Sequence, residues 1–223
     1  MTRIVLLPGM DGTGELLAEF AAELAPEFST TVVDYPKDVA LDYAELTTIV
    51  RRQLPQDEPF ALVAESFSGP IAIRLAAIKP DGLLAVVLCA SFSKSPRPWL
   101  RAFTGLLRSM PFRMIPIGLL MPLLMGRWSS RDWSRRVQAA IRSIEPAVLR
   151  RRLMEVSMVD DSPLIADIAC PLLYLRAGSD RLVPRDAWTI IRDRSDHAVC
   201  MEIEGPHFLL QAKPKECAAA IKR

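Results

Sequence analysis

The chain is 223 residues long, half of them apolar, with a formal net charge of +2. This length and composition suit one α/β domain with a full hydrophobic core and exclude a largely disordered chain. The charge is unevenly distributed: residues 93–152 contain thirteen Lys or Arg against two acidic residues, and the remainder contains fifteen basic and twenty-four acidic residues. The sequence therefore indicates a basic middle segment within an acidic body.

The cysteines and the apolar runs indicate the cellular compartment of the protein and whether it spans a membrane. The four cysteines form no CxxC pair and lie far apart, at Cys89, Cys170, Cys200 and Cys217. We expect reduced, buried thiols in a cytoplasmic protein rather than a disulfide or zinc framework. The opening apolar run is too short for a signal peptide, and the longest one, Phe103 to Met125, is interrupted by arginines and prolines, which argues against a spanning helix.

Short apolar runs alternate with helical patterns, which is typical of βαβ units and a mostly parallel sheet. The expected strands are residues 3–7, 30–34, 60–64, 85–89, 172–176 and 198–203. The expected helices are residues 15–24, 43–54, 69–78, 185–193 and 214–222. Because most of these strands are continuously apolar, helices should cover both faces of the sheet.

The alternation stops between residues 93 and 162. No strand pattern is evident there, and prolines cut the helical periodicity at Pro111, Pro116, Pro122 and Pro146. Since strand and helix alternate again from residue 172, we predict that this segment is a helical lid. The predicted organisation is a core in two parts, residues 1–92 and 163–223, with the lid 93–162 between them.

Ser66 directly follows the apolar run 60–64 and precedes a helical pattern. A serine on such a turn projects its hydroxyl above the carboxyl edge of the sheet, where backbone N–H groups stabilise developing negative charge. Crowding at this turn favours glycine two positions before and after the serine, where this chain has Ala64 and Ser68, followed by Gly69. The alternative interpretation of Ser66 is a helix N-cap.

A nucleophilic serine needs a base, and the chain has two histidines. His207 follows the last expected strand and should lie at the same sheet edge as Ser66; a surface or capping histidine is the alternative. His197 precedes that strand, so we expect a loop residue on the opposite edge. His207 is therefore the predicted base.

The base needs a carboxylate to hold its tautomer. Asp180 follows the fifth expected strand and is the predicted partner; an Asx-turn or N-cap residue is the alternative. Three other carboxylates precede that strand and should be badly placed: Asp160, Asp161 and Asp167.

The loop after the first expected strand, residues 8–14, contains three glycines that let the backbone approach a substrate. We predict an oxyanion hole formed by the N–H of Met10 in this loop and the N–H of Phe67. The glycine spacing is G-x-x-G-x-G, which differs from the dinucleotide pattern, so no cofactor is expected.

With these motifs the sequence resembles the α/β-hydrolase superfamily, in particular its small lidded esterases and acyl hydrolases. The matching segments are residues 6–12, 64–69, 178–184 and 205–208. The order Ser66, Asp180, His207 is that of the family's triad. Members usually have His-Gly in the first loop, where this chain has Pro8-Gly9, and the resemblance does not extend to the lid. The strands that usually precede this loop are missing, so it implies an α/β-hydrolase fold trimmed to about six strands.

The resemblance implies that Ser66 attacks an acyl carbonyl and that the substrate is a carboxylic ester or thioester with an apolar acyl group. The same triad could cleave a C–C bond or transfer an acyl group, and a non-catalytic lipid-binding protein is the non-enzymatic alternative. A haloalkane dehalogenase is disfavoured, because that chemistry uses an aspartate in place of Ser66. Glu65 is interpreted as a surface or loop-ordering residue.

The predicted lid is rich in apolar side chains: Trp99, Phe103, Leu106, Leu107, Phe112, Ile115, Ile117, Leu119, Leu120, Leu123 and Leu124. They predict an apolar underside, an acyl-chain tunnel or a surface that contacts lipid. The interleaved arginines favour an anionic membrane surface or an acidic acyl carrier as partner, while a solvated basic face explains them equally well. No nucleic acid partner and no metal are expected.

Overall fold

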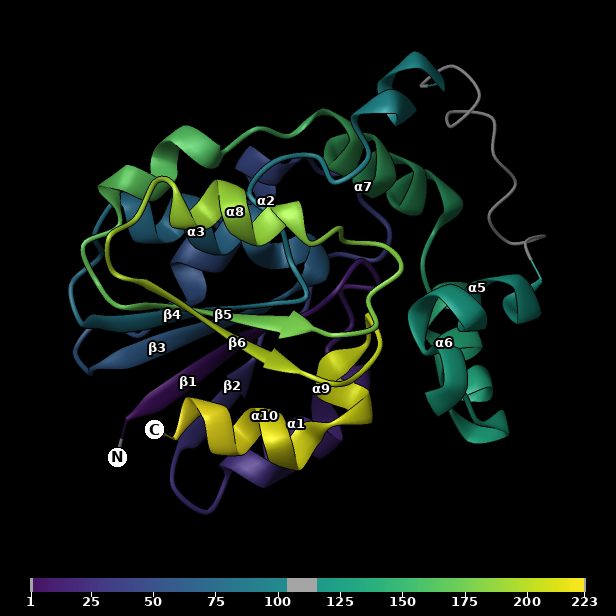
Figure 1. Cartoon of the computed structure of the whole chain (residues 1–223), viewed down its shortest axis with the longest axis horizontal. Helices are drawn as coiled ribbons and strands as arrows, with labels where there is room; N and C mark the ends of the chain where they lie inside the picture. Colours follow the sequence, from purple (N-terminus) through teal and green to yellow (C-terminus); the bar gives the residue numbers. More distant parts are fainter. Residues whose placement is uncertain (1, 104–115, 223) are drawn as a thin grey trace.

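The computed structural model describes residues 2–103 and 116–222. Within them six strands form one sheet in the order β2-β1-β3-β4-β5-β6, with every neighbouring pair parallel (Figure 1). The strands are β1 (Arg3–Leu7), β2 (Ser29–Val32), β3 (Phe60–Glu65), β4 (Leu83–Cys89), β5 (Leu172–Ala177) and β6 (Ala198–Ile203). The predicted parallel sheet of six strands is confirmed.

Strand β2 begins and ends earlier than the predicted 30–34. The N–H of Val33 still donates to β1, at the carbonyl of Leu6 (2.9 Å), but the N–H of Tyr35 donates to the carbonyl of Gly12 (2.8 Å) in the loop after β1. The chain therefore leaves the sheet after Val33 because its next backbone donor is bonded to that loop. Hydrophobic periodicity carries no information about this contact.

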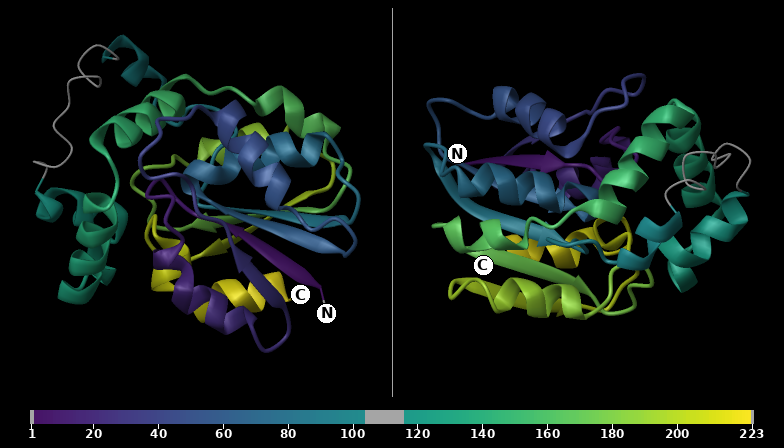
Figure 2. Two further views of the ribbon diagram at one scale, coloured as in Figure 1. Left: turned by 180° about the vertical axis from the view of Figure 1, so that it is seen from behind. Right: turned by 90° about the horizontal axis from the view of Figure 1, so that it is seen from above.

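Helices cover both faces of the sheet (Figures 1 and 2). On one face lie α2 (Tyr43–Gln53), α3 (Gly69–Ala77) and α8 (Asp186–Arg192), and on the other lie α1 (Ala18–Leu24), α9 (Leu209–Ala212) and α10 (Pro214–Ile221). Because successive strand residues point to opposite faces, Leu62 of β3 packs in one apolar core and Val63 in the other. The sheet is buried from both sides, as the continuously apolar strands predicted.

Between β4 and β5 the chain leaves the sheet for helices at the carboxyl ends of the strands (Figure 2). The described part of this connection contains a 3₁₀ segment (Pro98–Phe103), α5 (Ile117–Leu124), α6 (Arg131–Arg142) and α7 (Pro146–Met158). Four of the apolar residues expected here lie outside the described residues: Leu106, Leu107, Phe112 and Ile115. No helix in residues 2–103 or 116–222 is both long and apolar enough to cross a membrane.

Not all arginines of this connection are exposed and free of acidic partners. Arg136 of α6 forms an ion pair with Glu19 of α1. Arg151 of α7 pairs with Asp42 at 3.2 Å, and its neighbour Arg152 is 1% exposed. Part of the basic segment is therefore neutralised by the acidic body or buried, and the basic surface is smaller than the sequence suggested.

Candidate active site

Ser66 lies at a strained turn between β3 and α3. The chain passes from Glu65 through a 3₁₀ segment (Ser66–Ser68) into the helix, and Ser66 has a φ of 46°, in the left-handed region that a β-carbon disfavours. Its side chain is half-buried at the carboxyl end of β3, beside a helix N-terminus that favours negative charge. The N-cap interpretation is wrong, because Ser68 occupies the N-cap position of α3.

The missing glycines of the turn are compensated by its neighbours. Ala64 fits at the end of β3 with no exposed surface. The hydroxyl of Ser68 donates to the carbonyl of Pro8, which ties the turn to the loop after β1. The closest approach falls at Gly69, where a β-carbon would lie 1.9 Å from Ser91 Oγ. Glycine is therefore required one position later than the common pattern has it.

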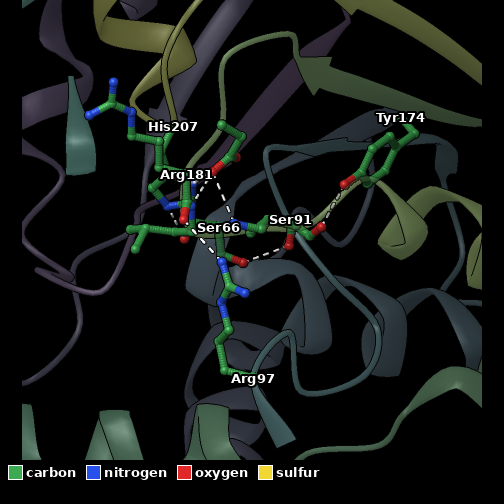
Figure 3. A network of polar contacts seen from close by, with 9 residues as sticks. Ser66, Ser91, Arg97, Tyr174, Arg181 and His207 are labelled. Carbon is green, nitrogen blue, oxygen red and sulfur yellow. Dashed lines mark hydrogen bonds and ion pairs between the residues drawn. The ribbon is translucent and has the colours of Figure 1, made fainter. Parts of the chain in front are cut away.

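Neighbouring strands brace the backbone of this turn (Figure 3). Ser91 follows β4 and donates from Oγ to the carbonyl of Ser66 at 2.6 Å. Tyr174 of β5 donates its hydroxyl to the carbonyl of Ser91 at 2.7 Å. This chain of hydrogen bonds holds Ser66 in a conformation that would otherwise relax.

His207 lies on the loop after β6, and its ring reaches Ser66 (Figure 3). Its Nε2 is 2.8 Å from Ser66 Oγ, and its Nδ1 is 2.9 and 3.1 Å from the two carboxylate oxygens of Asp180. The side chains of His207 and Asp180 are 4% and 6% exposed, so these hydrogen bonds form largely away from water. The three residues that the sequence singled out thus lie in one hydrogen-bonded row.

The loop after β5 fixes the orientation of the Asp180 carboxylate. Its Oδ1 accepts hydrogen bonds from the N–H groups of Leu182 (2.8 Å) and Val183 (2.9 Å). This is an Asx-type turn, the alternative interpretation of Asp180, and it occurs together with the contact to His207. The interpretations of Asp180 as an Asx-turn residue and as the partner of His207 are therefore compatible, since the turn orients the carboxylate that faces the imidazole.

Other charged groups considered from the sequence lie elsewhere. Asp160 pairs with Lys94 at 2.9 Å, and Asp161 pairs with Arg74 at 2.7 Å. His197 is exposed in the turn before β6, at the opposite edge of the sheet from His207. Among the described residues, no group of three or more His, Cys, Asp or Glu side chains is arranged to hold a metal ion.

The loop after β1, residues 8–14, is fixed by a residue that the sequence analysis missed. Arg152 of α7 donates to two carbonyls of this loop, one of them that of Met10, both at 2.8 Å, and to the carbonyl of Pro36 at 2.9 Å. Gly12 has a φ of 66°, and a β-carbon there would lie 2.6 Å from Arg152 Nη1. Nothing in the sequence distinguishes Arg152 from the other arginines of its segment.

The predicted oxyanion donors belong to segments that flank Ser66. Strands β1 and β3 are neighbours at the point where the strand order reverses, so the loop that carries Met10 and the turn that carries Phe67 meet at one edge. The carbonyl of Phe67 accepts a hydrogen bond from Tyr43 OH at 2.9 Å, and the two rings stack with centroids 4.8 Å apart. The backbone carbonyls of both predicted donor residues therefore accept a side-chain hydrogen bond, that of Met10 from Arg152 and that of Phe67 from Tyr43.

A cavity of about 400 Å³ opens beside Ser66 and His207. Apart from Asp11 and these two residues its lining is almost entirely apolar: Met10, Leu16, Leu120, Leu124, Val137, Ile141, Leu149, Leu153, Leu182 and Phe208. Helices α5, α6 and α7 supply most of these side chains. The connection between β4 and β5 thus supplies most of the apolar wall of the cavity, and its role as a lid stays a prediction.

Helix α5 is hydrogen-bonded to the loops of both His207 and Asp180. The N–H of Phe208 donates to the carbonyl of Leu124 at 2.9 Å, and Arg181 Nη1 donates to the carbonyl of Pro122 at 3.1 Å. A cation at the carbonyl end of a helix is favourable. Helix α5, which lines the cavity, is therefore hydrogen-bonded to Phe208 and Arg181, the residues that follow His207 and Asp180 in the chain.

Comparison with known proteins identifies the family. Residues 4–220 match the model of the alpha/beta hydrolase family, and the chain belongs to that family. A search of curated protein sequences gives no match.

Solved structures show the same fold at low identity. A hydrolase from Oleispira antarctica superposes with a TM-score of 0.81 at 15% identity, over 99% of this chain and 90% of that one. A lipase-esterase related protein from Clostridium acetobutylicum gives 0.82 at 15%, over 99% and 93%. The enol-lactonase from Burkholderia xenovorans gives 0.79 at 17%, over 99% and 90%.

Proposed function

We propose that the protein is a serine hydrolase that cleaves a carboxylic ester or thioester with an apolar acyl group. The observation that carries this proposal is the row from Ser66 Oγ through His207 to Asp180, which opens onto an apolar cavity. Membership of the alpha/beta hydrolase family supports it. Two of the similar structures, a lipase-esterase related protein and an enol-lactonase, are named for chemistry at ester carbonyls.

In the proposed reaction Ser66 Oγ attacks the acyl carbonyl while His207 Nε2 accepts its proton. Asp180 accepts a hydrogen bond from the N–H at His207 Nδ1 and offsets the imidazolium charge. The N–H groups of Met10 and Phe67 donate to the tetrahedral oxyanion. His207 then protonates the leaving alcohol or thiol, and water, deprotonated by His207, releases the acid from the Ser66 ester.

An active-site probe tests the nucleophile. A fluorophosphonate should phosphonylate folded protein at Ser66, because the adjacent base activates that hydroxyl, and the Ser66→Ala variant should remain unlabelled. Intact mass with peptide mapping gives the site. Failure to label folded wild type would favour a non-catalytic binding protein, and equal labelling of the variant would mean that a residue other than Ser66 is the reactive nucleophile. Products formed with an added alcohol, or from a C–C substrate, separate hydrolysis from acyl transfer and from C–C cleavage.

The apolar acyl group is tested by filling the cavity. Ile141→Trp adds volume at the cavity wall, so it should lower kcat/KM for a p-nitrophenyl decanoate relative to the acetate by roughly tenfold or more. Leu119→Trp is the matched control, because Leu119 also lies in the connection between β4 and β5 but is 65% exposed and does not line the cavity. Equal effects of the two variants on the chain-length ratio would contradict an acyl site here.

An anionic membrane surface or acidic acyl carrier stays a prediction. Leu119 and Leu123 of α5 are exposed, and the side chains of Arg127 and Arg135 are 70% and 78% exposed. Apolar and basic groups in one region suit such a partner, although fewer arginines are available than the sequence indicated.

A further inference from the structure

A buried acid and a buried amide meet directly behind the Ser66 turn. Glu65 ends β3 and is 2% exposed, so of its two interpretations, a surface or a loop-ordering residue, the surface position is wrong. Gln211 lies in α9, four residues after His207, and is 4% exposed. The side-chain amide of Gln211 donates from Nε2 to Glu65 Oε2 at 3.2 Å.

The two remaining oxygens of this pair have no partner. Glu65 Oε1 and Gln211 Oε1 are both buried and accept no hydrogen bond from any group in the part of the chain that the structure describes. An ionised carboxylate can only accept, so it would leave both oxygens unsatisfied at considerable cost. A proton on Glu65 Oε1 would give the pair a second donor, and the acceptor of the pair that has no partner is Gln211 Oε1. Acid and amide would then be joined by two antiparallel hydrogen bonds.

We propose that Glu65 is a neutral carboxylic acid that pairs with Gln211 and positions the Ser66 turn against the His207 loop. It is a positioning residue, because it acts through the backbone on either side of it. The pair joins the residue before the nucleophile to the helix after the base. The positioning role rests on the proposed hydrolase function, whereas the protonation state of Glu65 does not.

The surroundings of Glu65 favour the neutral form. Burial, and secondarily the nearby Asp11, raises the pKa of Glu65 from 4.5 to about 7, against the lowering effects of Gln211, His207 and the N–H of Gly9. The buried thiol of Cys89 also faces Glu65, and the pKa of this thiol is raised mainly by burial, then by Cys217, and also by Glu65.

A negative charge at Glu65 would also oppose the proposed chemistry. Glu65 Oε2 lies 3.3 Å from where a β-carbon of Gly9 would stand, so the carboxyl is in contact with the loop that carries Met10. The substrate oxyanion would develop charge in front of the same loop. Keeping Glu65 protonated removes a like charge from behind the predicted oxyanion donors.

The Glu65→Gln variant is the decisive test, because glutamine is neutral and can form the same two hydrogen bonds with Gln211. At pH 6 it should keep kcat within about threefold of wild type and the same melting temperature, whereas Glu65→Ala and Gln211→Leu should lose both. Wild type should lose kcat/KM above about pH 7 as Glu65 ionises, and Glu65→Gln should lack this decline. Large losses in Glu65→Gln at pH 6 would overturn the proposal in favour of a required carboxylate.

Two readouts need no turnover. The infrared difference spectrum between wild type and Glu65→Gln at pH 6 should contain the band of a protonated carboxyl, and its absence would overturn the proposal. Because the folded protein retains a proton that the unfolded chain releases above pH 4.5, wild-type stability relative to Glu65→Gln should fall from pH 4.5 to about 7. Glu27→Gln, at an exposed carboxylate, is the control and should show neither signal. If these signals appear without any esterase activity, only the proposed function fails.

Discussion

Replacing His207 with alanine should lower kcat for ester hydrolysis by about 10⁴-fold or more, and Ser66→Ala should have an effect of the same size. In the proposed mechanism Ser66 Oγ and His207 Nε2, which are 2.8 Å apart, act as one unit. Without Nε2 the hydroxyl keeps its proton, and without Oγ the base has nothing to deprotonate. Steady-state rates on a p-nitrophenyl ester, corrected for active-site concentration, measure the effect.

The double variant sharpens this test. Because each single change already disables the unit, Ser66→Ala with His207→Ala should be no slower than either alone, leaving the residual catalysis of about 10³-fold that binding and oxyanion donors provide. His197→Ala is the matched control at the exposed histidine and should leave the rate unchanged. Multiplicative effects of the two replacements, or more than a tenth of wild-type kcat in His207→Ala, would contradict a shared role.

The sequence carried enough information to place these residues because each follows a strand. In a parallel sheet the carboxyl ends of all strands lie at one edge, so a serine after β3, an aspartate after β5 and a histidine after β6 must converge. The chain order of Ser66, Asp180 and His207 therefore predicted their proximity better than the local serine motif did. The turn itself departs from the expected pattern because Gly69, rather than residue 68, makes the close approach.

The sequence does not reveal side chains whose structural role depends on a partner far away in the chain. Arg152 reaches the loop of Met10 across more than a hundred residues, and its neighbour Arg151 is an ordinary half-exposed arginine. Glu65 was interpreted as a surface or loop-ordering residue, and an acidic residue is rarely buried without a charged partner. The partner that accompanies its burial, Gln211, is distant in the chain.

The connection between β4 and β5 contributes side chains directly to the cavity. Helix α5 contributes Leu120 and Leu124 to the cavity, and its last carbonyls accept hydrogen bonds from residues next to His207 and Asp180. An acyl chain that contacts α5 would therefore contact an element already bonded to both loops. Under the proposed function, this arrangement would link the choice of acyl group to the placement of His207 and Asp180.

Asp180→Asn should lower kcat by about 10⁴-fold while leaving the protein folded. In the native loop Oδ1 accepts from the N–H groups of Leu182 and Val183, so the asparagine must place its oxygen there to satisfy these donors. Its NH₂ group then faces His207 Nδ1, which can no longer carry a proton. The imidazole proton moves to Nε2, the atom that must accept the proton of Ser66.

Because the two backbone hydrogen bonds survive in Asp180→Asn, its melting temperature should stay close to that of wild type, whereas Asp180→Ala removes them and should melt lower. Asp167→Asn changes an exposed carboxylate and is the control for both measurements. The ring-nitrogen NMR signals of His207 report the tautomer directly and should show the proton on Nε2 in Asp180→Asn. A proton still on Nδ1, or a kcat above a tenth of wild type, would mean that Asp180 does not set the tautomer of the base.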